Sequence, residues 1–240
     1  MGEQMRRLDA VRERLRPVIA EIAAGTVARE KDHELPFAQV TALRAAGFGR
    51  LRLPIEHGGF GLDWESFAEV LIELAAADSN LPQIFRGHIA YVEHILAATP
   101  SERRSRWLER IADGELVGNA WSENGAAAVG TNATRVTRRP DGSWRVDGRK
   151  FYTTGSIFAE WIDATVDLDG TTVTALIRRH QDGVEISDDW DGFGQPLTGT
   201  GTAVFTDASV DEDDVEPFTS RFPFQTVSYT HLTLPTILLV

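Results

Sequence analysis

The residue pattern of this chain changes abruptly at Asp113-Gly114. Before this point, apolar residues recur every three or four positions, the spacing that places them on one face of a helix. After it, short runs rich in Val, Thr and aromatic residues are separated by Asp-Gly pairs at 141–142, 147–148, 169–170 and 182–183. Asp-Gly favours tight hairpin turns because both residues tolerate a left-handed backbone. The pattern therefore predicts helices first and an antiparallel sheet second.

Five helices are expected in the first part of the chain. The first carries apolar residues at helical spacing from Met5 to Ile22, and Gly25 is its expected stop. A glycine-rich loop over 54–62 is expected to separate the second helix from the third, because so much glycine disfavours regular structure. The remaining helices are expected from Pro36 to just before Gly47, over 63–77, over 82–97, and from an N-cap at Thr99-Pro100 to 112.

The second part predicts an antiparallel β-barrel or sandwich. No alternation of strand and helix is visible, which excludes a doubly wound nucleotide-binding fold. The expected fold class is α+β, with an N-terminal all-α helical domain over 1–112 and a middle β-domain over 113–217. Strands are expected near 115–122, 131–138, 143–147, 150–153, 161–167, 172–178 and 201–206.

Composition excludes several classes of function. A formal net charge of -12 opposes binding to nucleic acid or to anionic membrane surfaces. The chain has no cysteine, and neither a His-Glu-x-x-His pattern nor a calcium-loop spacing is found, so no metal site is expected. The N-terminus leads into an amphipathic pattern and not an apolar run, so a cytoplasmic protein without a membrane span is expected.

Two segments carry the residues best suited to chemistry. Gly118 to Asn124 and Gly148 to Ile162 each place an aromatic residue beside small hydroxyl residues in a strand-like context. This combination suits a planar ring that is stacked on one face and hydrogen-bonded at its edge. A flavin is such a ring, and a reduced flavin needs N–H and O–H donors at its polar edge.

The order of these and other motifs resembles the acyl-CoA dehydrogenase superfamily of flavoproteins over about residues 5–226. Ser122-Glu123 looks like the first flavin motif of that family. The run from Asp147 to Thr154, Asp-Gly-Arg-Lys-Phe-Tyr-Thr-Thr, looks like the second. Earlier matches are Leu43-Arg44 with Gly47-Phe48, then Pro54 and Gly58-Gly59-Phe60-Gly61. The resemblance implies a helical domain and a β-domain as expected above, followed by a C-terminal helical bundle that this chain lacks. Because the bundle covers the flavin in the family, the truncated chain alone is expected to be inactive.

Details of the motifs are similar to the branch that contains dibenzothiophene monooxygenase and the sulfur-acquisition oxidoreductases. Glu123 is followed by Asn124-Gly125 where classical dehydrogenases have Glu-Pro, and the second motif reads Phe-Tyr-Thr-Thr-Gly-Ser. The resemblance favours a two-component monooxygenase that oxidises a small organic, organosulfur-type substrate with O2. It implies FMN, reduced by a separate flavin reductase, with FAD as the alternative cofactor, and a homotetramer for the full-length protein.

The resemblance also assigns site residues. Asn119, Trp121 and Ser122 would be flavin neighbours, although a core aromatic and an ordinary strand serine remain alternatives for the last two. Tyr152 and Thr154 would lie against the ring and donate to its edge. Because side chains alternate along a strand, both are expected to face one side, with Thr153 on the other. His88, in the fourth expected helix, would hold or shuttle a proton at the reactive face, unless it is only a packed helix histidine.

Lys150 is expected to mark an exposed strand end.

Other features point to a chain cut short. Residues 218–226 are expected to begin a linker to the missing bundle. The segment 227–240 resembles the translation of a sequencing adapter and is expected to be non-native, with a genuine apolar strand as the alternative. Two other functions stay open, namely an FAD-dependent acyl-CoA dehydrogenase and an inactive fragment or non-catalytic binding protein.

Overall fold

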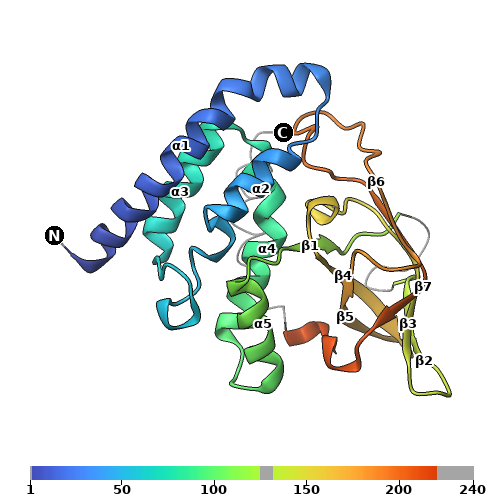
Figure 1. The fold of residues 1–240 in the computed structure, drawn as a ribbon. Helices are drawn as coiled ribbons and strands as arrows, with labels where there is room; N and C mark the ends of the chain where they lie inside the picture. Colours follow the sequence, from blue (N-terminus) through green and yellow to red (C-terminus); the bar gives the residue numbers. More distant parts are fainter. Residues whose placement is uncertain (1, 125–131, 221–240) are drawn as a thin grey trace, which may run out of the picture.

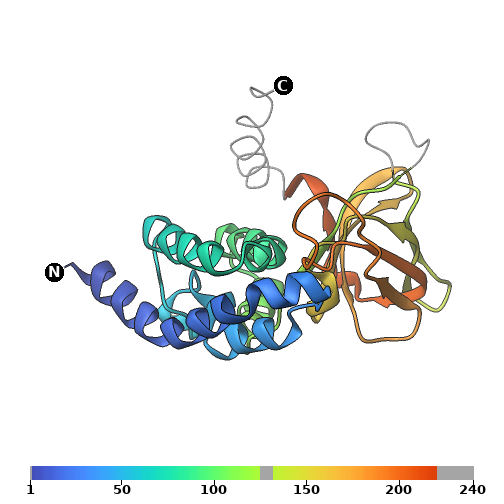
Figure 2. The same cartoon turned by 90° about the horizontal axis from the view of Figure 1, so that it is seen from above.

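The computed structural model describes residues 2–124 and 132–220 of the 240-residue chain. Helices lie on one side and strands on the other, as Figures 1 and 2 show from two directions. This arrangement confirms the expected α+β class of helices followed by a mostly antiparallel sheet. The expected non-native tail lies outside the described residues. The α-helices are α1 (Glu3–Asp32), α2 (Phe37–Ala45), α3 (Trp64–Ala77), α4 (Asn80–Ala97) and α5 (Glu102–Ala112).

Helix α1 does not stop at Gly25, contrary to the expectation from sequence, but continues to Asp32. The glycine is needed for room, because a Cβ at this position would lie 2.5 Å from the guanidinium of Arg29. That guanidinium donates to the carbonyl of Ile22 and to Asp78 at 2.8 and 3.1 Å. Gly25 therefore allows a buried ion pair that ties α1 to the end of α3.

The N-caps of α3 and α5 are side chains that accept from helix amides. Asp63 caps α3 and accepts from the amide of Ser66 at 2.9 Å. Trp64, expected from its spacing to lie on the buried side of this helix, is half exposed. Helix α5 is capped by Ser101, which accepts from the amide of Arg104 at 3.1 Å, and not by Thr99. A serine hydroxyl at the N-cap satisfies an amide that has no partner within the helix.

The strands form one eight-stranded sheet in the order β6-β7-β3-β2-β4-β5-β8, with β1 paired to β4. Most neighbours are antiparallel, whereas β4 pairs in parallel with both β1 and β2. Two short strands were not expected from sequence, and the strand expected over 150–153 is not formed, because β3 ends at 150. The strands are β1 (Val117–Ala120), β2 (Arg135–Arg138), β3 (Trp144–Lys150), β4 (Trp161–Leu168), β5 (Thr171–Arg178), β6 (Val184–Ser187), β7 (Thr202–Val210) and β8 (Val215–Pro217).

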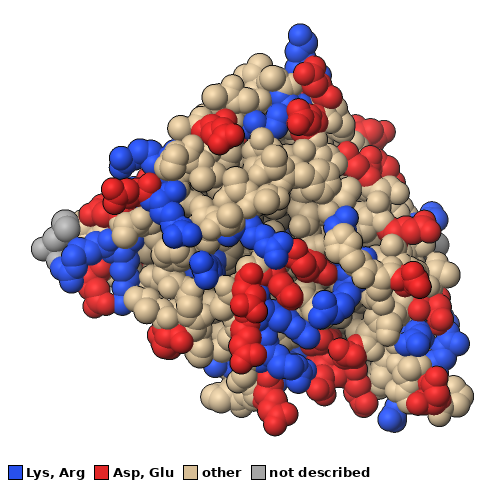
Figure 3. Space-filling model, viewed as in Figure 1, with Lys and Arg blue, Asp and Glu red and all other residues tan. Residues whose placement is uncertain are grey.

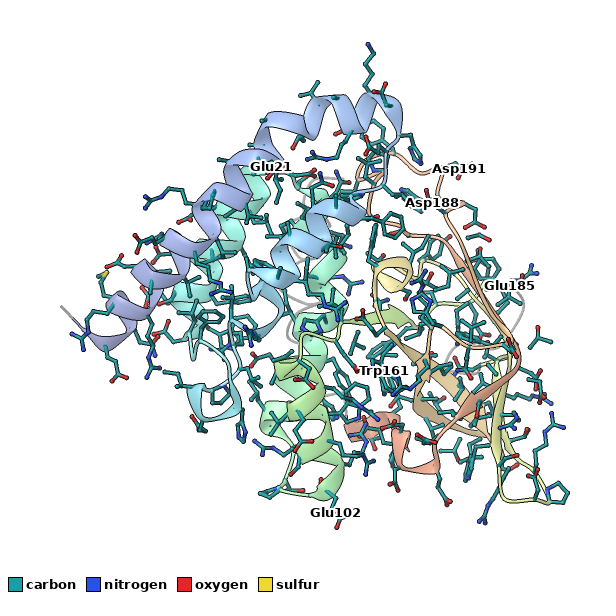
Figure 4. The ribbon with its side chains drawn as sticks, viewed as in Figure 1. Glu21, Glu102, Trp161, Glu185, Asp188 and Asp191 are labelled. Carbon is teal, nitrogen blue, oxygen red and sulfur yellow. The ribbon has the colours of Figure 1, made fainter. Side chains whose placement is uncertain are left out.

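Trp161, at the start of β4, joins the helices to the sheet (Figure 4). Its ring meets the ring of Trp107 edge-on, with centroids 5.0 Å apart. The guanidinium groups of Arg110 and Arg178 each lie 4.3 Å from its centroid. Trp107 in turn donates its indole N–H to Asp214 at 2.9 Å. Aromatic and cation–π contacts of this kind make the two sides one packed body.

The surface reflects the composition of the chain. Positive and negative side chains are interspersed on the face seen in Figure 3. Ion pairs among the described residues include Arg106 with Asp213 and Arg103 with Glu216. Within the described residues, no helix has the length and apolar content needed to cross a membrane.

Candidate functional site

The two motif segments lie side by side where β1 and β3 end. Ser122 and Phe151 form an isolated antiparallel bridge, in which the Phe151 amide donates to the Ser122 carbonyl at 2.9 Å. The Thr165 hydroxyl of β4 donates to the carbonyl of Trp121 at 2.9 Å and holds the first segment from behind. Residues 121–122 and 151–154, about thirty positions apart in sequence, therefore form one edge.

Tyr152 and Thr154 do not alternate along a strand as expected. Tyr152 has a left-handed backbone with φ 57, and its side chain is 46% exposed. Thr153 causes the turn, because both its amide and its hydroxyl donate to the carbonyl of Gly201, at 2.9 and 3.0 Å. A non-glycine residue with positive φ is strained and persists only where its surroundings enforce it. The result is an outward-facing Tyr152, which meets Trp190 edge-on with centroids 5.9 Å apart.

Thr154 is buried beneath this turn. Its hydroxyl lies 2.7 Å from that of Thr200, which lies 2.7 Å from that of Thr198. Its carbonyl accepts from the Asn119 amide at 3.5 Å and so touches the end of β1. The hydroxyl of Thr154 therefore belongs to a row of hydroxyl groups and not to an isolated side chain.

The three residues of the first segment differ in environment. Ser122 is exposed, whereas Trp121 is partly buried and donates its indole N–H to the buried Asp163 at 3.2 Å. The side-chain oxygen of Asn119 accepts from Arg86 of α4 at 3.2 Å. Ser122 thus exposes its side chain at the edge, while Trp121 and Asn119 are fixed by neighbouring elements.

Lys150 and Glu123 form a buried ion pair directly behind the two segments. Lys150 is fully buried and is not the exposed strand end expected from sequence. Its ammonium group donates to Glu123, Asn132 and Thr165 at 2.6, 2.9 and 3.2 Å. An ammonium has three N–H donors, so this set satisfies all of them. The sequence analysis did not pair these two residues, although Glu123 lies in the first motif and Lys150 in the second.

Glu123 is held by more than the lysine. Its carboxylate also accepts from the amides of Ala133 and Thr134, at 2.7 and 3.0 Å. Burial by itself raises its pKa, but these hydrogen bonds and the one from Lys150 outweigh that effect and lower the pKa to about 2. Burial also lowers the pKa of Lys150, against the attraction of Glu123. The pair links the first motif, the start of β2 and the end of β3.

His88 lies between the helices and β1, and it is only 2% exposed. Its Nε2 is 2.7 Å from the carbonyl of Gly49, and its Nδ1 accepts from the amide of Val117 at 3.3 Å. Since a carbonyl only accepts, Nε2 carries the proton and Nδ1 does not. Burial lowers the pKa of His88 to about 4, despite the hydrogen bond to Gly49. The ring is therefore neutral and uses both nitrogens to connect α4 with the start of β1.

The chemistry of this edge fits a flavin ring. An isoalloxazine has two apolar faces and a rim of donors and acceptors. Tyr152 and Trp190 provide aromatic surface, and the hydroxyls of Ser122 and Thr154 provide polar contacts beside it. Within the described residues, no group of three or more His, Asp or Glu side chains is arranged to hold a metal ion.

Comparison with known proteins identifies the family. Residues 2–115 match the model of the acyl-CoA dehydrogenase N-terminal domain. The chain is 30% identical over 199 residues to a dibenzothiophene monooxygenase of Rhodococcus erythropolis. The matched region covers 80% of this chain and 48% of the relative. Residues 2–115 belong to the acyl-CoA dehydrogenase N-terminal domain family. The chain spans about half the length of the curated relatives that it matches.

Several of the proteins similar to this chain are monooxygenases. The FMN-bound crystal structure of TdsC, a dibenzothiophene monooxygenase from Paenibacillus sp. A11-2, superimposes with a TM-score of 0.77 at 29% identity. The superimposed region covers 88% of this chain and 53% of the TdsC chain. The probable FMNH2-dependent monooxygenase SfnC of Pseudomonas putida is 26% identical over 203 residues, 83% of this chain and 50% of SfnC.

Proposed function

We propose that this protein is a two-component, FMNH2-dependent monooxygenase that oxidises a small organosulfur compound with O2. The observation that carries the proposal is the edge formed by Ser122 and residues 151–154, where an aromatic side chain and hydroxyl groups meet in a flavoprotein fold. Similarity to dibenzothiophene monooxygenases and to FMN-bound TdsC supports FMN over other ring cofactors.

Each predicted site residue has a role in this proposal. Tyr152 lies against the ring, and the Ser122 hydroxyl hydrogen-bonds its edge. Thr154 presents its hydroxyl oxygen from below, while Trp121 and Asn119 shape the end of β1 next to the ring. Reduced FMN, when bound, supplies the electrons that activate O2. The side chains of the edge orient the ring.

His88 was predicted to hold or shuttle a proton, and that role stays a prediction. Its buried, neutral ring with both nitrogens bonded supports a positioning role, in which it fixes Val117 and so the strand that leads to Asn119 and Trp121. A separate flavin reductase as partner and a homotetramer of the full-length protein are parts of the same proposal. The FMNH2-dependent relative supports the reductase, because reduced FMN must be supplied to such an enzyme. The homotetramer rests on the family resemblance alone.

Flavin titration tests the proposal. We expect the purified 240-residue chain to quench FMN fluorescence on binding and to prefer FMN to FAD. Tyr152→Ala should weaken FMN binding about ten-fold, the scale of one aromatic stacking contact. Trp64→Ala is the control, because Trp64 is 50% exposed on α3 and away from the edge. Equal effects of both substitutions would contradict the placement of the ring.

The family match over residues 2–115 keeps one alternative, an FAD-dependent acyl-CoA dehydrogenase. Tighter binding of FAD than of FMN, together with reduction of the bound flavin by an acyl-CoA thioester, would favour it. Absence of any flavin binding would favour a non-catalytic protein or an inactive fragment.

A further inference from the structure

Three buried threonine hydroxyls form a row that ends at Thr154. Thr154, Thr198 and Thr200 are 4%, 2% and 8% exposed, and each adjacent pair of hydroxyl oxygens is separated by 2.7 Å. At the far end, the Thr198 hydroxyl donates to the carbonyl of Gln195 at 3.1 Å. The row therefore runs from the candidate flavin edge to a backbone carbonyl.

The carbonyl fixes the direction of every hydrogen bond in this row. A hydroxyl has one hydrogen and can accept with its lone pairs, whereas a carbonyl can only accept. The hydroxyl hydrogen of Thr198 is used in the bond to the Gln195 carbonyl, so Thr200 must donate to Thr198. Thr200 then has no hydrogen left, so Thr154 must donate to Thr200. The hydrogen of Thr154 points into the protein, and only lone pairs remain for a ligand.

The surroundings hold the three threonines in place. Gly155 donates its amide to the carbonyl of Thr198 at 3.3 Å, and Thr153 is bonded twice to Gly201. On the other side, the amide of Leu197 donates to Asn80 at 3.2 Å, which anchors the segment to the start of α4. The threonine backbones are therefore held from both sides, which keeps the three hydroxyls within hydrogen-bond distance of one another.

We propose that this row makes Thr154 an acceptor, and not the donor expected from the family resemblance, and that this acceptor selects reduced over oxidised flavin. The inference rests on the proposed function, because it requires a flavin at this edge. Reduction adds hydrogens to the edge of the ring, among them the one on N5, so a reduced flavin has donors that an acceptor at this edge can bind. The same nitrogen of an oxidised flavin carries only a lone pair, which an acceptor repels. Such selection suits an enzyme that must take reduced FMN from solution in the presence of the oxidised form.

Paired titrations test this inference without any measurement of turnover. Oxidised FMN is titrated in air and reduced FMN under anaerobic conditions, and the ratio of the two dissociation constants is the readout. Thr200→Val keeps the shape of the side chain but removes the hydroxyl, so the Thr154 hydroxyl becomes free to donate outward. Thr200→Ser is the matched control, because it keeps the hydroxyl and loses only the methyl group.

We expect the wild-type chain to bind reduced FMN more tightly, and the preference to fall about five-fold in Thr200→Val, the scale of one hydrogen bond. Thr200→Ser should keep the wild-type ratio. Thr198→Val provides a second test should Thr200→Val fold poorly, since it lets Thr200 donate to Thr154 and should lower the preference in the same way.

The outcomes separate the two proposals. Equal binding of both redox states by the wild type, or an unchanged ratio in Thr200→Val and Thr198→Val, would overturn the acceptor role while leaving FMN binding intact. Binding of neither redox state by the wild type would overturn the proposed function and the inference with it.

Discussion

Replacing Lys150 by methionine tests whether the buried ion pair with Glu123 holds the candidate site together. Methionine fills much of the space of the lysine stem but leaves the Glu123 carboxylate without its cation. Glu123 would keep the amides of Ala133 and Thr134 as donors. Removal of one partner of a buried pair typically costs 3–5 kcal/mol, and these remaining donors place the expected loss near the lower end, at about 3 kcal/mol.

The assay is urea unfolding followed by circular dichroism, with a double-mutant cycle. Glu123→Gln alone should also destabilise the fold, because it leaves a buried ammonium without its carboxylate. The double variant Glu123→Gln with Lys150→Met should lose less than the sum of the two single losses, by about 2 kcal/mol. Such coupling would show that the two charges stabilise the fold as a pair.

An exposed ion pair provides the control. Arg106 and Asp213 lie 3.2 Å apart, with 38% and 71% of their side chains exposed. Arg106→Met should cost less than about 1 kcal/mol, because water screens exposed pairs. If Lys150→Met costs no more than Arg106→Met, the pair is not buried in solution and the reasoning fails.

Two further predictions concern the stability of the fold at low pH. Because the pKa of Glu123 is lowered from 4.5 to about 2 in the folded protein, its contribution to stability is complete above pH 4.5 and is lost as the pH falls towards 2. This loss should be smaller than the roughly 3 kcal/mol that the full shift would give, because the Glu123 carboxylate is partly exposed, and it should be absent from Glu123→Gln. The pKa of His88 is lowered from 6.5 to about 4 in the folded protein. Between pH 6.5 and pH 4, His88 is therefore protonated in the unfolded chain and neutral in the folded one. Stability should therefore fall between pH 6.5 and 4 with a slope near 1.4 kcal/mol per pH unit, and His88→Gln should abolish that slope; an unchanged slope would show that His88 titrates normally.

Local patterns predicted most of the elements and their type. The Asp-Gly pairs and the helical spacing marked where helices give way to strands, and Gly47 has the left-handed backbone expected just beyond α2, with φ 86. The errors came from contacts between residues distant in sequence. Gly25 resembles a helix stop because its role, making room for Arg29 to reach Asp78, depends on another helix.

The candidate site was less predictable for the same reason. Strand alternation failed at Tyr152 because a carbonyl at Gly201, about fifty residues later, turns the chain at Thr153. Lys150 resembled a surface residue because its partner belongs to the other motif. The short strands β6 and β8 carry too little alternation to stand out, and only their pairing with β7 and β5 defines them.

The pairing of β1 with β4 also bears on how the chain folds during synthesis. The amide of Leu116, just before β1, donates to the Glu160 carboxylate 44 residues later in the chain. At about 5–20 residues per second, a ribosome needs roughly two to nine seconds to make that stretch. During this interval the helices have emerged, but the Trp107 surface still waits for Trp161 and Asp214. A nascent chain is thus most exposed to aggregation just before β4 is complete, and chaperone binding should concentrate there.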